Sequence, residues 1–180
     1  MGAIRGNKIS MIFQEPMTAL NPLQTIGKQI AESLLIHTDA SQKNAKAMAA
    51  RTLSRVGLDP LIISPSRYPY QLSGGQRQRV MIAMAFILKP KLIIADEPTT
   101  ALDVKTQAEI LNLLQDLVKK ENISLLLITH DLAVIAKLTT KVAIMKNGEL
   151  VETGSTETIF KKLSHVYTEQ LLLDSIPKTL

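Results

Sequence analysis

The spacing of apolar residues along the chain changes repeatedly between two patterns. Short apolar runs predict buried strands, and stretches with an apolar residue every three or four positions predict amphipathic helices. The expected strands are residues 8–13, 91–95, 124–129, 142–145 and 150–152. The expected helices are residues 25–37, 41–56, 74–88, 104–120, 132–138, 156–163 and 167–173. Strands that alternate with helices indicate an α/β fold with a mostly parallel sheet, and the nearly all-helical stretch 25–90 indicates an inserted helical subdomain.

Two of these elements carry expectations about burial. The helix 104–120 is expected to bury one apolar face, which consists of Val104, Ala108, Leu111, Leu114 and Val118. In the strand 124–129, apolar residues follow one another without a polar break from Leu125 to Ile128. A continuous run of this kind is typical of a strand that is covered on both faces of its sheet.

Composition narrows the function classes. The chain of 180 residues is 46% hydrophobic, which is enough for one domain with a real core. Its longest uncharged apolar run, from Val80 to Leu88, is much shorter than the roughly 20 residues that a membrane-spanning helix needs. The absence of cysteine excludes disulfides and thiolate metal sites, and it fits a cytosolic protein.

The net charge of +5 has two interpretations. A basic balance can indicate binding to nucleic acid or to an anionic membrane surface, whereas scattered charges most often form a solvated surface. Aromatic residues make up only 3% of the chain and tryptophan is absent, so a stacking platform for single strands is not expected. We therefore expect no nucleic-acid partner.

The first candidate for chemistry is the string Ser73-Gly74-Gly75-Gln76 at a predicted helix start. Ser73 and Gln76 have the spacing of a capping box. A capping box does not explain two glycines in the first turn of a helix, where each costs about 1 kcal/mol relative to alanine. Bare backbone N–H groups at the positive end of a helix suit a closely approaching phosphate. The string therefore predicts a phosphate-binding surface as well as a cap.

The second candidate is the pair Asp96 and Glu97, which follows the apolar run Leu92–Ala95. Ligand sites of α/β folds form at the carboxyl ends of strands. There, one carboxylate can hold Mg²⁺ and the other can orient and polarise a water molecule. A solvated loop is the plainer alternative for two adjacent acids. Asp103, further along, is in position to cap the next helix.

Residues 72–103, which contain these strings, closely resemble the signature motif, Walker B motif and D-loop of ATP-binding-cassette (ABC) ATPases. Two further strings follow in the order typical of that family. Gln14, after the first predicted strand, resembles the Q-loop glutamine, and His130, after the strand 124–129, resembles the switch histidine. The resemblance covers nearly the whole chain, and it implies an incomplete P-loop NTPase fold of the ABC type.

The resemblance implies ATP and Mg²⁺ as cofactors and gives each residue a role. Asp96 would hold the metal ion, mostly through water, and Gln14 would sense it. Glu97 would orient the attacking water, and His130 would contact the γ-phosphate. The string from Ser73 to Gln76 would contact nucleotide held by a second ATPase subunit or half. The Q-loop region would receive transmembrane permease subunits, which implies a cytoplasmic protein that is peripheral on the inner face of the cell membrane.

Within the family, the chain resembles ATP-binding subunits of peptide importers of the oligopeptide, dipeptide and microcin C types. This likeness rests on residues 4–8, the loop 15–23 and the tail 164–172, in which Val166 replaces the family's usual proline. The implied organisation has four parts, which are residues 1–24 with the Q-loop, a helical subdomain 25–90 with the signature, a RecA-like core 91–155 and a helical extension 156–180.

One motif of the family is missing from the sequence. The Walker A loop requires G-x-x-x-x-G-K-[ST], and no two of the eight glycines have that spacing. We expect an N-terminally truncated chain that is inactive alone, through truncation, a split gene or a start upstream of Met1.

Two functions stay open: an ATP-hydrolysing subunit of a peptide importer, and a catalytically inactive remnant or interaction module that offers only its signature face. A DNA-repair ABC ATPase is disfavoured, because no coiled-coil insertion or zinc site is visible.

Overall fold

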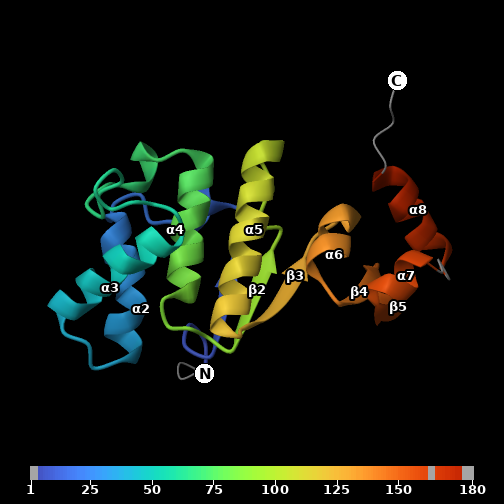
Figure 1. Cartoon of the computed structure of the whole chain (residues 1–180), viewed down its shortest axis with the longest axis horizontal. Coiled ribbons are helices and arrows are strands. Elements are labelled where there is room, and N and C mark those ends of the chain that lie inside the picture. Colours follow the sequence, from blue (N-terminus) through green and yellow to red (C-terminus); the bar gives the residue numbers. More distant parts are fainter. Residues whose placement is uncertain (1–3, 162–164, 176–180) are drawn as a thin grey trace. The chain divides into compact units, whose positions relative to one another are not determined.

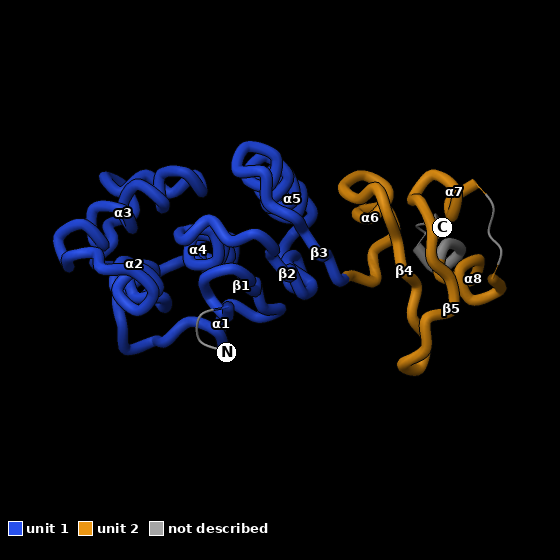
Figure 2. The backbone as a smooth tube through the Cα atoms, turned by 90° about the horizontal axis from the view of Figure 1, so that it is seen from below, with its two compact units in different colours: residues 1–128 blue, residues 129–180 orange. Residues whose placement is uncertain are grey.

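The computed structural model describes residues 4–161 and 165–175 (Figure 1). The chain forms two compact units, which meet between Ile128 and Thr129 (Figure 2). The four-part organisation implied by the resemblance is a finer division than this one, and it stays a prediction.

Every expected strand and helix is present. The first unit contains β1 (Ile9–Ile12), α1 (Pro16–Ala19), α2 (Ile26–His37), α3 (Gln42–Arg55), the 3-10 helix η1 (Pro69–Gln71), α4 (Gly74–Phe86), β2 (Leu92–Asp96), α5 (Val104–Glu121) and β3 (Ser124–Ile128). The second unit contains α6 (Leu132–Leu138), β4 (Lys141–Lys146), β5 (Glu149–Ser155), α7 (Thr156–Lys161) and α8 (Val166–Ser175). The short elements α1 and η1 were not expected, and the expected end of the helix 156–163 lies outside the described residues.

The sheet of the first unit is parallel, as expected, with the strand order β1-β2-β3. In register, Ile12 of β1 lies beside Ala95 of β2, and Ala95 lies beside Leu127 of β3. The carboxyl ends of the three strands therefore share one edge of the sheet, and the residues that follow each strand start from that edge.

Local interactions fix the ends of α3 and the start of α2. The Ser41 hydroxyl caps α3 by accepting from the Asn44 amide, and Gly57, with φ of +76°, ends it in the left-handed conformation. At the start of α2, the amide of Gly27 donates to the carbonyl oxygen of Pro65 at 2.8 Å. A Cβ on Gly27 would lie 2.6 Å from Cβ of Pro65, so only glycine lets the connector 58–68 pack this closely on α2.

The main core lies where α2, α3 and α4 meet each other and one face of the sheet. Its largest fully enclosed side chains are Phe86, Ile12, Ile26, Ile30, Leu53, Ile82 and Ile93. Helices α4 and α5 lie on one side of the strands (Figure 2). On that side of β2, Ile93 and Ala95 are completely buried. This face of the sheet therefore forms one boundary of the core, opposite the helices.

The apolar run of β3 is typical of a strand covered on both faces, but the described residues cover only one of them. Leu125 and Leu127 pack against the core, but Leu126 is 51% exposed and Ile128 is 46% exposed. The register places Met11, Ile94 and Leu126 side by side across this open face. The run of apolar residues is continuous, yet only the face toward α4 and α5 meets the core of the described residues.

The expected apolar face of α5 is correct in its second half and wrong at its start. Leu111 and Leu114 are buried, together with Ile110 and Leu117, whereas Val104 is 83% exposed and Ala108 is also exposed. Thr106 and Glu109 in the first two turns of α5 line a cavity together with the start of α4. The core therefore meets α5 only from Ile110 onward.

The second unit is built on a β-hairpin. Strands β4 and β5 are antiparallel, and Asn147 and Gly148 form the turn with φ of 52° and 84°, as a two-residue hairpin with both central residues left-handed requires. Val142, Ile144 and Ile159 form its small core. Of the helices in the described residues, none combines the length and hydrophobicity that a membrane span needs.

Candidate functional site

Two of the predicted site residues meet at the carboxyl edge of the sheet. Gln14 follows β1 and Glu97 follows β2, and these strands are neighbours. The side-chain amide Nε2 of Gln14 donates a hydrogen bond to Oε2 of Glu97 at 3.0 Å. Residues 83 positions apart in the sequence thus form one polar pair at the edge where α/β sites lie.

Glu97 has an unusual backbone. Its φ is +42°, in the left-handed region that costs a non-glycine residue roughly 1–3 kcal/mol. Its amide donates to the carbonyl oxygen of Ile128 at 2.9 Å, and this bond ties the residue to the end of β3. Strained residues of this kind gather at functional sites. The surrounding bonds fix the Glu97 carboxylate at the edge of the sheet.

Thr100 is a site residue that the sequence interpretation missed. Its hydroxyl donates to Oε2 of Glu97 at 2.7 Å, so this oxygen accepts from both Thr100 and Gln14. The signal available in the sequence was its position three residues after Glu97 in a turn, where a threonine side chain reaches back to its neighbour.

Asp96 is the last residue of β2 and is partly exposed beside Glu97. Within residues 4–161 and 165–175, no cluster of three or more histidine, cysteine, aspartate or glutamate side chains could hold a metal ion. Mg²⁺ in nucleotide sites typically takes one or two carboxylates and fills its other positions with water and phosphate oxygens. The donor set at Asp96 therefore fits Mg²⁺ that shares its ligands with a nucleotide.

The start of α4 forms the predicted capping box. The Ser73 hydroxyl accepts from the amide of Gln76 at 3.3 Å, and the amide of Ser73 donates to Oε1 of Gln76 at 3.0 Å. The first amides of a helix have no acceptor within the helix, so those of Gly74 and Gly75 face outward from this end. The cap and the phosphate-binding surface are compatible, because the hydroxyl accepts in the cap and keeps a proton to donate.

The two glycines differ in what surrounds them. A Cβ on Gly75 would lie 2.6 Å from the Thr106 methyl carbon, so a glycine is required there for α4 to approach α5. A Cβ on Gly74 would meet only Leu102, at an ordinary contact distance of 3.5 Å. Helix packing thus explains Gly75, whereas Gly74 is exposed and has the open surroundings that an external ligand needs.

A cavity of about 340 Å³ lies between this helix start and α5. It is lined by Ser73, Gly74, Gly75, Gln76, Arg79, Ala101, Leu102, Asp103, Thr106 and Glu109. Asp103 caps α5 as expected, and the Thr106 side chain and amide donate to its carboxylate and hold the pKa of Asp103 below its ordinary value. The lining contains neither Gln14 nor Glu97, so the signature surface and the carboxylate pair are separate sites.

His130 lies at the start of the second unit. It is exposed and stands beside Asp131, whose carboxylate caps α6 by accepting from the Ala133 amide at 2.9 Å. Its role as the switch histidine stays a prediction.

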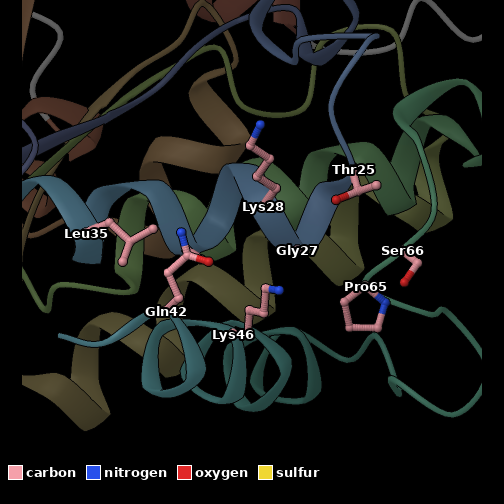
Figure 3. Close-up of a pocket in the computed structure, with 9 residues that line it drawn as sticks. Thr25, Gly27, Lys28, Leu35, Gln42, Lys46, Pro65 and Ser66 are labelled. Carbon is pink, nitrogen blue, oxygen red and sulfur yellow. The ribbon is translucent and has the colours of Figure 1, made fainter.

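A further cavity, of about 510 Å³, lies between α2 and α3, away from every predicted site residue. Gln42 and Lys46 rise from α3 toward α2, and Pro65 and Ser66 of the connector close one end (Figure 3). Its lining mixes exposed lysines with apolar side chains and contains no carboxylate.

Comparison with protein families finds a match to the ABC transporter family over residues 2–100. The glutathione import ATP-binding protein GsiA of Salmonella typhimurium is 52% identical over 178 residues, which is 99% of this chain but 28% of GsiA. The oligopeptide transport ATP-binding protein AppD of Bacillus subtilis is 52% identical over 174 residues, or 97% of this chain and 53% of AppD. The chain thus spans about half of one curated relative and less than a third of the other.

Solved structures give the same fold. A bacterial ABC transporter cassette, MJ0796, in its dimeric structure matches 86% of this chain and 65% of its own with a TM-score of 0.73 and 33% identity. A dimeric post-hydrolysis state of the same ATP-binding cassette, bound to ADP and Pi, matches 84% of this chain and 64% of its own with a TM-score of 0.72 and 31% identity. The expected fold, an incomplete P-loop NTPase fold of the ABC type, is confirmed.

Proposed function

Because the chain belongs to the ABC transporter family, we propose that it supplies the carboxylate pair and the signature surface of an ATPase that drives peptide uptake. The observation that carries this proposal is the hydrogen bond from Gln14 to Glu97 at the carboxyl edge of the sheet. It joins the residue that would sense the metal ion to the residue that would polarise the attacking water. The relatives named for oligopeptide and glutathione import support a peptide as the transported class.

In this proposal the residues at the carboxyl edge of the sheet have different roles. Glu97 accepts a proton from the attacking water, and Gln14 and Thr100, which donate to its Oε2, hold the carboxylate in place. Asp96 would hold Mg²⁺, and the bound ion would neutralise charge on the transferred phosphoryl group. His130 would contact the γ-phosphate.

The separation of the two sites favours a second ATPase subunit or half as a partner. Ser73 to Gln76 line a cavity that contains neither Gln14 nor Glu97. A phosphate at the outward-facing amides of Gly74 and Gly75 would therefore belong to nucleotide that another subunit holds. The dimeric cassettes among the structural relatives agree with this arrangement.

The Q-loop region is the proposed surface for transmembrane permease subunits. Met17 and Leu23, which follow Gln14, are large exposed apolar side chains. A subunit docked there would contact the same segment that carries Gln14, so permease movement would reach the Gln14–Glu97 pair through a few residues. With a permease docked in this way, the chain itself would lie in the cytoplasm against the inner face of the membrane.

Uptake of a labelled peptide tests the proposal. The chain is joined in frame behind a segment that carries a phosphate-binding loop and is assembled with permease subunits in vesicles. Ser73→Arg is expected to abolish ATP-dependent uptake while ATP still binds, because the longer side chain fills the phosphate-facing helix end. Ser54→Arg, at an exposed position of α3 outside both sites, is the matched control and is expected to transport normally. Normal uptake with Ser73→Arg would contradict the proposed role of the signature surface.

The alternative of an inactive remnant or interaction module gains no support from the comparisons, because the named relatives are import ATP-binding proteins. It predicts that Ser73→Arg weakens binding of the partner, whereas Glu97→Gln, outside the signature face, changes neither partner binding nor ATP turnover.

A further inference from the structure

The two arginines that follow Gln76 contact different parts of the first unit. Arg77 donates from Nε to the carbonyl oxygen of Pro69 at 2.7 Å, and its Nη1 contacts the sulfur of Met17. These contacts join α4 to η1 and α1. Arg77 therefore faces the Q-loop side of the signature helix.

Arg79 faces the opposite way. It donates from Nη1 to the carbonyl oxygen of Val56 at 2.9 Å and from Nη2 to Oε2 of Glu109 at 2.9 Å. Val56 ends α3, and Glu109 lies in the second turn of α5. One guanidinium thus links three helices, and its planar fork suits two acceptors at once.

The surroundings of Arg79 leave room for this bridge. A Cβ on Gly57 would lie 2.9 Å from Nη1 of Arg79, so the glycine that ends α3 also admits the guanidinium. The Arg79 side chain is only 18% exposed, and both Arg79 and Glu109 line the same cavity as the signature residues. The ion pair therefore spans the cavity's two walls, α4 and α5.

We propose that Arg79 is a positioning residue that holds α5, and with it Asp103, at a fixed distance from the signature turn. This inference rests on the proposed function, because the cavity matters only if nucleotide of a second subunit enters it. The contact between Gly75 and Thr106 sets how closely the two walls approach, and the ion pair of Arg79 with Glu109 keeps them from separating. Arg79 acts through the wall positions and does not itself contact the reacting atoms.

Amide hydrogen exchange of the 180-residue chain tests the positioning directly. Glu109→Gln removes the negative charge from the α5 arm of the bridge and leaves a weaker, neutral acceptor, and Arg79→Lys replaces the planar fork that serves both acceptors with a single ammonium. In both variants, amides in residues 104–109 are expected to exchange about two- to fivefold faster, which is the range for a partly exposed ion pair. Exchange in β2 is expected to stay unchanged, which would show that the unit remains folded.

Arg77→Lys is the matched control, because it changes an arginine of the same helix that does not contact α5. Its residues 104–109 are expected to exchange at the wild-type rate. The proposal is overturned if Glu109→Gln leaves that exchange unchanged, or if Arg77→Lys accelerates it equally.

A kinetic measurement in the assembled transporter separates positioning from general stability. Glu109→Gln is expected to lower kcat for ATP about two- to fivefold with KM unchanged. The reason is that the position of α5 would affect stabilisation of the transition state and not the initial binding of ATP. A rise in KM with kcat unchanged would overturn the proposal. If the wild-type transporter showed no ATP turnover, the proposed function would fail, while the exchange result would still decide the role of Arg79.

Discussion

The helical part of the first unit and its sheet differ in how completely they are enclosed. In α2, α3 and α4, apolar side chains such as Ile30, Leu53 and Ile82 are fully buried. The side-chain amide of the buried Gln29 has hydrogen-bond partners on both ends. Its Oε1 accepts from the Asn21 amide, and its Nε2 donates to the carbonyl oxygens of Asn21 and Gln24. The described residues enclose one face of the sheet, and the other face exposes Leu126 and Ile128.

This difference shows which part of the fold its own residues complete. The helices bury their apolar faces against each other and against one side of the strands, so their core is closed by the described residues. A parallel sheet normally has both faces covered. The open face is therefore the part of this unit that the described residues leave uncovered, and the pair Gln14 and Glu97 lies at the edge of that same sheet.

The largest expected effect comes from opening the enclosed part. Phe86 is completely enclosed in the core, and Phe86→Ala is expected to lower the free energy of unfolding by about 3–5 kcal/mol. Leu126→Ala on the open face is expected to lower it by less than about 1 kcal/mol, because half of that side chain is already in water. Urea unfolding followed by circular dichroism measures both values. Equal losses for the two variants would remove the contrast between the enclosed and open parts.

The second effect concerns the open face itself. Met11→Lys combined with Leu126→Lys is expected to lower the fluorescence of a bound hydrophobic dye about twofold or more, because contiguous apolar surface recruits such dyes. Leu61→Lys is the matched control, since Leu61 is a single apolar residue on the connector that is 94% exposed. It is expected to leave dye binding nearly unchanged. A larger drop with Leu61→Lys would place the apolar surface elsewhere.

The smallest effect is electrostatic. The hydrogen bond from the Lys89 ammonium lowers the pKa of the Glu121 carboxyl most strongly. Partial burial raises that pKa and the nearby Arg55 guanidinium lowers it, and the net result is a pKa below the ordinary value. The folded state therefore favours the ionised carboxylate. Its contribution is complete above the unfolded pKa, about 4.3, and is lost as the pH falls through the lower folded pKa.

Glu121→Gln is accordingly expected to lower the free energy of unfolding at pH 7 by up to about 1 kcal/mol, since Lys89 is largely exposed. The difference from wild type should disappear toward pH 3. Glu157→Gln, in an exposed pair with Lys161 on α7, serves as the control with almost no effect. A difference for Glu121→Gln that grows in acid would contradict the sign of the pKa shift.

The sequence predicted the elements well because their signals are local. Ser41, Ser73 and Asp103 cap helices through bonds to residues three positions on, and that spacing is visible in the string itself. The motifs also singled out Gln14 and Glu97 as candidate site residues, and the structure adds that the two side chains are joined by a hydrogen bond.

What the sequence could not predict depends on distant neighbours. Which face of β3 is open depends on which face the helices cover, and a continuous apolar run looks the same in either case. Likewise, nothing near Gly75 indicates that Thr106 requires the glycine, and nothing near Arg79 indicates Glu109. These contacts arise only once α4 and α5 lie side by side.

The central claim is that Glu97 is the carboxylate that polarises the attacking water, and one measurement tests it most directly. ATP binding and ATP turnover are compared in the assembled transporter for wild type, Glu97→Gln and Glu149→Gln, the last being exposed in the hairpin of the second unit. Glu97→Gln is expected to bind ATP normally and to lose about 10²–10⁴-fold in turnover, because the amide keeps the shape of the carboxylate and cannot accept the proton. Glu149→Gln is expected to behave as wild type. Turnover by Glu97→Gln at the wild-type rate would contradict the account.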